Sequence, residues 1–265
     1  MKFLDSYISV FFGSFFAVLL IWSGILFFTG QKTTEWNYLF NALNALLFFS
    51  VGIVALFGVR LHGFQSAVGK ELLSIALSMF SFSLGLFVWC YFNIILKVAT
   101  PYPSLADLFL VLYIPFLGYG IVNLLRAFGM FYSTRILVET IVIFGLTSIL
   151  IFFIGNPPDL SVAVPLLQKS LNIFYLLGDA FLISLGYMLI RLTKGRIHGS
   201  FFYLVGALFA MAGADLIFAY RTGTETYWNG DIADVLYALS GFLFSIGVTK
   251  IVSSQLKIAS VNMQK

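Results

Sequence analysis

Charged residues are scarce in this chain. They make up 10% of its 265 residues, whereas 60% are hydrophobic, and a soluble domain carries about 25% charged residues. The mean hydropathy is +1.00. These values exclude a soluble globular protein and predict an integral membrane protein. The net charge of +4 is small and its basic residues are spread among the loops, which argues against a nucleic-acid-binding surface.

Cysteine, histidine and catalytic motifs are almost missing as well. The single cysteine, Cys90, lies in an apolar run and can form no internal disulfide. His62 and His198 lie in basic turns without a cysteine or acidic partner, so neither a metal site nor a cofactor is expected. There is no glycine-rich phosphate loop, no serine–histidine pair and no carboxylate pair on a soluble face. We therefore expect no enzymatic activity from this chain by itself.

Long apolar runs take the place of these features. Spanning a bilayer takes about 20 apolar residues, and eight runs are long enough: 7–29, 37–59, 72–96, 106–128, 136–155, 170–191, 199–220 and 232–252. The first run is too long for a signal-peptide core and has no cleavage site after it. The prediction is an all-α, polytopic membrane protein with a transmembrane domain over residues 1–252 and a cytoplasmic tail over 253–265.

The lysines and arginines predict the orientation. With the N-terminus inside, eleven basic residues lie on the inner side and four on the outer side. The inner set is Lys2, Arg60, Lys70, Arg126, Arg135, Arg191, Lys194, Arg196, Lys250, Lys257 and Lys265; the outer set is Lys32, Lys97, Lys169 and Arg221. Because basic residues accumulate on the cytoplasmic side, both termini are expected in the cytoplasm.

The two halves of the chain, about 1–130 and 131–252, resemble each other. Ser104-Leu-Ala-Asp107 begins the fourth run, and Asp231-Ile-Ala-Asp234 begins the eighth run 127 positions later. Gly120 and Gly247 keep the same offset. Four spans per half predict a 4+4 parallel repeat, with a pseudo-axis along the membrane normal.

Asp107 and Asp234 allow two explanations. Each stands three residues after a capping residue at the start of a span. Acids there satisfy free N–H groups and oppose the positive end of the helix dipole. Both are also candidates for ligand contact, and the two roles are compatible.

Asp179 and Asp215 lie inside apolar runs, where a charge costs about 2.5–3.5 kcal/mol on insertion scales. Their first-half counterparts are apolar, near Phe48 and Phe87. One explanation is a structural acid that is protonated or bonded to a neighbouring helix; the other is ligand or ion sensing. With Tyr237, Asp107 and Asp234, these two acids form the candidate outer-half site. Another intramembrane acid, Glu139, is expected to pair with Arg135 at the i−4 position.

The tail has the apolar spacing of a heptad seam. Val252, Leu256, Ala259 and Met263 follow a 4-3-4 spacing, which is typical of a helix that leaves the membrane and starts a coiled coil. Two heptads do not establish a coiled coil.

Four motifs carry a resemblance to a known family: Thr100-Pro-Tyr-Pro-Ser-Leu-Ala-Asp107-Leu-Phe, Leu177-Gly-Asp179-Ala-Phe-Leu, Ala214-Asp215-Leu-Ile-Phe-Ala-Tyr and Thr224-x-Thr-Tyr-x-x-Gly-Asp231-x-x-Asp234. From about residue 37 to 250, the chain resembles the multi-pass membrane region that precedes diguanylate cyclase, cyclic-di-GMP phosphodiesterase or histidine kinase domains in prokaryotic signalling proteins. The resemblance implies a sensory or signal-relaying module of the prokaryotic plasma membrane. Since no such catalytic domain follows before Lys265, we expect either a stand-alone relative or a fragment.

The expected function is therefore a membrane sensor that passes a signal to a cytoplasmic protein or within a homodimer. Its ligand would be an unidentified small molecule or ion. A small transporter or an ion or proton channel using the same acids is the main alternative. A structural subunit of a membrane complex is the third.

The orientation is testable with a C-terminal fusion to a reporter that is active only in the periplasm. We expect no reporter activity, because the basic residues favour a cytoplasmic C-terminus. Activity of that reporter would contradict the topology and imply an odd number of spans.

Overall fold

The computed structural model describes residues 2–127, 133–155, 165–193 and 199–263, and this part of the chain is helical. The elements are α1 (Lys2–Thr29), α2 (Glu35–His62), α3 (Ala67–Cys90) with a π-helical turn η1 (Tyr91–Ile95), α4 (Leu105–Ala127), α5 (Thr134–Gly155), α6 (Leu166–Thr193), α7 (Ser200–Gly223) and α8 (Ile232–Met263). Eight of these helices are long and apolar enough to cross a membrane. The prediction of an eight-helix membrane protein is confirmed.

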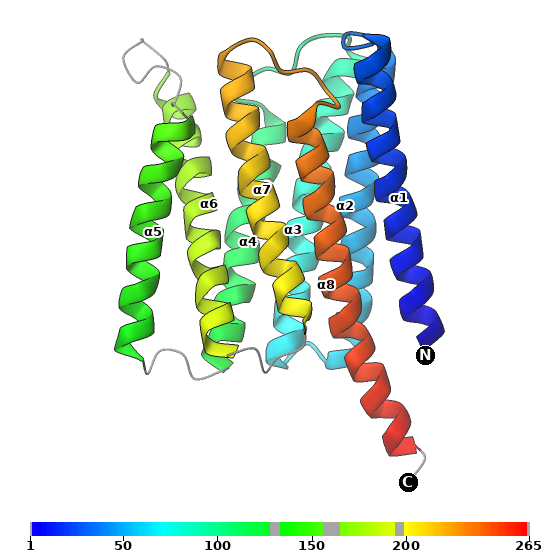
Figure 1. Cartoon of the computed structure of the whole chain (residues 1–265), viewed down its shortest axis with the longest axis vertical. Helices are drawn as coiled ribbons and strands as arrows, with labels where there is room; N and C mark the ends of the chain where they lie inside the picture. The colour runs from blue at the N-terminus through cyan, green and yellow to red at the C-terminus, as the bar shows by residue number, and fades with distance from the viewer. Residues whose placement is uncertain (1, 128–132, 156–164, 194–198, 264–265) are drawn as a thin grey trace.

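The helices run up and down in one bundle, with both termini at the same end (Figure 1). We call this the near end and the opposite end the far end. α3 packs against α2 and α4, while α8 packs against α7, α2 and α1. In the most apolar window of α8, 61% of residues are buried, compared with 17% in α1 and 11% in α5. α8 is therefore an interior helix, and α1 and α5 lie at the periphery.

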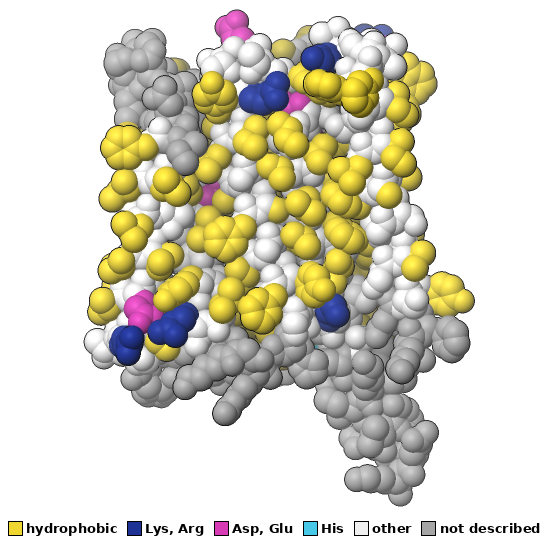
Figure 2. Space-filling view, viewed as in Figure 1, with side chains coloured by type: hydrophobic (Ala, Val, Ile, Leu, Met, Phe, Trp, Pro, Cys, Tyr) yellow, Lys and Arg dark blue, Asp and Glu magenta, His cyan; other side chains and the backbone are white. Residues whose placement is uncertain are grey.

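The surface matches a protein surrounded by lipid. Figure 2 shows apolar side chains along the side of the bundle and basic side chains mainly at its two ends. Large apolar side chains such as Ile21 on α1 and Ile141 on α5 are more than half exposed. Such a continuous exposed apolar surface is unfavourable in water and favourable in a bilayer. The chain is a multi-pass membrane protein.

Glycines let the interior helices approach closely. A Cβ atom on Gly58 of α2 would lie 2.6 Å from Val252 Cγ2 of α8 and 2.8 Å from Leu72 Cδ1 of α3. A Cβ atom on Gly247 of α8 would lie 2.6 Å from Leu204 Cδ2 of α7. Small residues at helix crossings maximise van der Waals contact where no hydrophobic effect drives helices together. The packing of α8 in the near half therefore depends on these two positions.

The helix α8 continues beyond the bundle. It has 32 residues, which is about 48 Å at the α-helical rise, against a hydrocarbon core of about 30 Å. Its membrane-spanning part ends at Ser253, and the helix continues to Met263. Figure 1 shows this last part leaving the near end of the bundle. The predicted boundary between domain and tail therefore falls inside one continuous helix.

The close packing at Gly58 makes a first structural prediction. We expect Gly58→Ala to lower the free energy of unfolding in detergent by about 1–3 kcal/mol, because the added methyl group overpacks the contact of α2 with α3 and α8. Denaturant titration followed by circular dichroism measures the change. The matched control is Gly24→Ala on α1, where no atom lies within 4 Å of the new Cβ. That variant should be unchanged or slightly more stable. Equal losses in both variants would contradict the packing.

Candidate functional site

The loop between α7 and α8 is held at the far end by three other helices. The Asn229 side-chain oxygen accepts hydrogen bonds from Asn41 Nδ2 of α2 (2.5 Å) and from Trp89 Nε1 of α3 (3.0 Å). Ser23 Oγ of α1 donates to the Gly230 carbonyl at 2.6 Å. Gly230 has a φ of +96°, which glycine adopts without strain. The loop is thus fixed in position from three sides, and the start of α8 with it.

The acids at the start of α8 bond to backbone N–H groups. Asp231 Oδ1 accepts the Ala233 N–H at 2.8 Å. Asp234 Oδ2 accepts the Gly230 N–H at 2.6 Å and the Tyr227 hydroxyl at 3.0 Å. Asp231 therefore caps α8, whereas Asp234 differs from the prediction: it bonds to the loop residue Gly230 and not to the residue three positions before it.

The start of α4 is built in the same manner. Asp107 Oδ2 accepts the Ser104 N–H at 2.7 Å, and Ser104 Oγ accepts the Ala106 N–H at 3.2 Å. Two orphan donors of the first turn are therefore satisfied by side chains. The Tyr175 hydroxyl of α6 lies 3.3 Å from Asp107 Oδ1. The Asp107 carboxyl thus joins α6 to α4 as well as capping the helix.

Three ionisable residues of the far end lie outside the candidate membrane spans: Asp231, Tyr102 and Tyr227. Asp231 is 2% exposed, and Arg221 Nε lies 3.0 Å from its Oδ2 atom without pointing its N–H bond at that oxygen. Burial raises the pKa of Asp231, and the Ala233 N–H and Arg221 oppose this. Burial and Asp107 raise the pKa of Tyr102 to about 12. Burial and Asp234 also raise the pKa of Tyr227, so both phenols remain hydrogen-bond donors at neutral pH.

Two further carboxyl groups meet between α6 and α7. Asp179 of α6 is 3% exposed, and its carboxyl lies within hydrogen-bonding reach of the Asp215 carboxyl of α7. Asp215 Oδ1 accepts the Tyr237 hydroxyl of α8 at 2.5 Å. No hydroxyl, amide or basic group in the described residues bonds to Asp179 Oδ2. This pair links α6, α7 and α8 in series.

A tyrosine that the sequence did not single out completes the group. Tyr113 of α4 is 3% exposed, and its hydroxyl has no hydrogen-bond partner among the described residues. It interacts electrostatically with Asp179 and Asp215. The ring of Phe82 packs between Tyr113 and Tyr237, at 5.7 and 5.6 Å between centroids. The Tyr113 hydroxyl is therefore a free hydrogen-bonding group in the described structure, next to the two carboxyl groups.

The structure brings all five predicted site residues into one region. Tyr237 interacts electrostatically with both Asp215 and Asp234, and Tyr175 with both Asp107 and Asp215. We call this group the far-end polar cluster; it comprises Asp107, Tyr113, Tyr175, Asp179, Asp215, Tyr227, Asp234 and Tyr237. It draws side chains from α4, α6, α7, α8 and the loop before α8.

The chemistry of the cluster is acidic. Among the described residues, no basic side chain forms an ion pair with Asp107, Asp179, Asp215 or Asp234. Two buried carboxyl groups that face each other without a basic partner are stabilised by a proton or a cation. In the same part of the chain no three His, Cys, Asp or Glu residues are grouped to hold a metal ion. The cluster is therefore acidic, without a basic counterpart in the described residues.

Outside the cluster, one acid was predicted correctly and two buried polar residues were missed. Glu139 pairs with Arg135 at 3.0 Å as predicted, and it also binds Arg191 and Tyr187 of α6. Sequence reasoning missed Glu71, which is 1% exposed, and Asn44, which is 0% exposed with neither side-chain polar atom bonded in the described structure. Local sequence gives no signal for either, because their burial depends on which helices surround them.

No family model, curated protein or solved structure matches this chain.

Conservative substitutions test how the carboxyl pair contributes to folding. We expect Asp179→Asn and Asp215→Asn to change the melting temperature in detergent only slightly, because an amide keeps hydrogen-bonding capacity and carries no charge. Asp215→Leu should lower the free energy of unfolding by about 1–3 kcal/mol, since it leaves the Tyr237 hydroxyl without its acceptor. If the asparagine variants were destabilised as much as the leucine variant, ionised carboxylates would be holding the bundle together.

Proposed function

We propose that this chain is a non-enzymatic sensory or signal-relaying module of a prokaryotic plasma membrane, with both termini in the cytoplasm. In this proposal the far-end polar cluster is the input, and the part of α8 beyond the bundle is the output to a cytoplasmic protein or a second copy of the chain. The resemblance of the four motifs to membrane regions of signalling proteins supports the proposal. The acidic chemistry of the cluster supports a proton, a monovalent cation or a small cationic ligand as the stimulus.

One observation carries the proposal: the single helix α8 joins the far-end polar cluster to the part that leaves the bundle. α8 begins at Ile232, directly after the capping residue Asp231, and carries Asp234 in its first turn. The hydroxyl of its Tyr237 donates to Asp215, and the helix continues to Met263 outside the bundle. A continuous helix moves nearly as a rigid rod, so a displacement at one end is felt at the other. Because Tyr237 bonds to Asp215, the position of α8 relative to α7 depends on the state of that carboxyl.

Glycines along α8 allow such a displacement in this proposal. Gly241 of α8 faces Leu47 of α2, and Gly247 faces Leu204 of α7. Small residues at these crossings let neighbouring helices slide with limited side-chain rearrangement. A stimulus biases the helix only if it binds the two positions with different affinity. Protonation or cation binding at Asp179 and Asp215 supplies such a difference, because it alters the hydrogen bonds available to Tyr237.

We also infer that the two halves are related by a 4+4 parallel repeat. α3 packs on α4 as α7 packs on α8, and α6 contacts α4 as α2 contacts α8. Asn172 of α6 accepts a hydrogen bond from Tyr102 before α4, and Asn41 of α2 donates one to Asn229 before α8. Tyr102 and Asn229 are 127 positions apart, the offset of the other repeated residues. Asp179 and Asp215 belong only to the second half, so they are an addition to the repeated scaffold.

A proton path is the second candidate function, and Glu71 favours it. This acid is buried near the start of α3, closer to the near end of the bundle than the cluster is. Acids at two depths are typical of proton relays. Proton flux in proteoliposomes under an imposed pH gradient separates the two functions: a relay channel gives flux that Asp179→Asn abolishes, and a sensor gives none.

The sensory proposal predicts motion of α8 at the near end. In a Cys90→Ala background, spin labels at Arg60→Cys and Lys250→Cys report the distance between α2 and α8; both sites are exposed. We expect the distance distribution to differ between mildly acidic and mildly alkaline pH. Asp215→Asn should abolish the difference.

The control for this experiment is Glu225→Gln, which neutralises an exposed acid in the loop before α8 and should leave the response intact. Identical distance distributions at both pH values in the unmodified protein, with Na⁺ and with K⁺, would contradict signal relay through α8.

A further inference from the structure

Glu71 is the one buried acid in the described near half that has no partner. It lies on α3 and is 1% exposed, and its Oε2 atom makes no hydrogen bond in the described structure. Glu139, at the same end, has Arg135, Arg191 and Tyr187 around it. Glu71 is not a helix cap either, because Ser66 Oγ already accepts the Gly69 N–H at 2.9 Å. Neither ion pairing nor capping accounts for its position.

The neighbouring helix makes room for this carboxyl group. A Cβ atom on Gly120 of α4 would lie 2.7 Å from Glu71 Oε2 and 2.6 Å from Ser74 Cβ. Any larger residue at Gly120 would displace the carboxyl or separate α3 from α4. The close approach of these two helices at glycine therefore creates a niche of carboxyl size.

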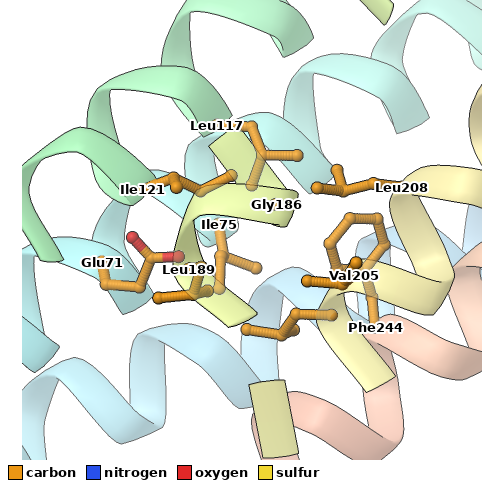
Figure 3. Close-up of a pocket in the computed structure, with 10 residues that line it drawn as sticks. Glu71, Ile75, Leu117, Ile121, Gly186, Leu189, Val205, Leu208 and Phe244 are labelled. Atoms are coloured by element: carbon orange, nitrogen blue, oxygen red, sulfur yellow. The ribbon is translucent and has the colours of Figure 1, made fainter. Parts of the chain in front are cut away.

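The niche adjoins a cavity at the centre of the bundle (Figure 3). The cavity is about 10 Å³, which is the lower limit of the volume that holds a single water molecule. Glu71 is the one polar side chain in its lining; the others are Ile75, Leu117, Ile121, Gly186, Leu189, Leu204, Val205, Leu208 and Phe244. These residues come from α3, α4, α6, α7 and α8, so the cavity lies where the two halves of the molecule meet.

The charged groups at this end do not neutralise Glu71. The lining residues from α4, α6, α7 and α8 are neither charged nor titratable. Within the described residues, the basic or titratable residues on the surrounding helices at this end are Arg60, His62, Lys70, Tyr119, Arg126, Tyr187, Arg191, Tyr203 and Lys250. None forms an ion pair or hydrogen bond with Glu71 in the described part of the chain; His62 Nε2 lies 3.3 Å from the Ile251 carbonyl, and Arg191 binds Glu139.

We propose that Glu71 and this cavity form a second intramembrane binding site, which takes one proton and, when the proton is released, admits water. An unpaired carboxylate in an apolar interior is strongly unfavourable, and a proton is the one cation that needs no further ligands from the wall. Loss of the proton leaves a charge that has to be hydrated, and the cavity provides the first position for a water molecule. Proton binding at Glu71 thus favours close packing of α3 and α4 against α6, α7 and α8. This site is independent of the far-end polar cluster and of the proposed sensory function.

Infrared spectroscopy of the protein in lipid vesicles tests the site directly. A protonated carboxyl group has a carbonyl stretching band that a carboxylate lacks. We expect the wild-type spectrum at neutral pH to contain one such band that is missing in Glu71→Gln and retained in Asp179→Asn. Exposed glutamates are ionised above about pH 4.3 and do not contribute. If Glu71→Gln removed a carboxylate band instead, Glu71 would be ionised and the proposal would be overturned.

A variant that leaves Glu71 in place checks the role of the niche. Gly120→Ala should shift or abolish the Glu71 carbonyl band, because the new methyl group displaces the carboxyl. Gly118→Ala is the control: it is on the same helix, and its Cβ would lie 2.8 Å from Phe181 Cε1 and away from Glu71. An unchanged band in Gly120→Ala would contradict the site.

Thermal melting provides the second readout. The native state holds a proton that the unfolded state releases, so the wild-type unfolding constant should rise by up to about tenfold per pH unit relative to Glu71→Gln. Parallel pH profiles for the two proteins, or failure of the neutral Glu71→Gln variant to fold, would overturn the proposal.

Discussion

The bilayer interior offers polar groups no water, so a buried acid of this bundle is stabilised by a partner within the protein or by a bound proton. Asp107 and Asp234 find theirs in the backbone N–H groups at helix starts. Asp179 and Asp215 find theirs in each other and in the Tyr237 hydroxyl. The last arrangement is stable only with a proton or cation in place, since no basic group in the described residues balances it. In the proposed mechanism, this requirement connects the packing of α6, α7 and α8 to the ionic conditions outside the bundle.

α8 is placed to respond to a change at the Asp179–Asp215 carboxyl pair. α8 is the most buried of the candidate spans and contacts α1, α2 and α7. Its far end is fixed by Asp231 and Asp234, and its near half is packed tightly at Gly247. In the proposed mechanism, a change at the carboxyl pair alters how α8 sits between these neighbours and thereby moves the part that leaves the bundle.

The sequence predicted features that depend on local chemistry. Eight apolar runs predicted the eight helices, and the cap at Asp107 followed from Ser104 three positions before it. Asp179 and Asp215 were recognisable because an acid in an apolar run is unusual. Tyr113 and Glu71 were not, since the carboxyl groups that interact electrostatically with Tyr113 come from α6 and α7 and the niche of Glu71 is created by Gly120 of α4. Such features depend on which helix faces are in contact, and that information is not local.

The most direct test of the central claim is a fluorine NMR probe attached to Lys250→Cys in the Cys90→Ala background, followed through a pH titration. If the carboxyl pair controls α8 through Tyr237, the probe signal should titrate in the otherwise unmodified protein and should stop titrating in Tyr237→Phe, which loses only the hydroxyl bonded to Asp215. A probe that titrates identically in both proteins would contradict the coupling between the far-end polar cluster and the near end of α8.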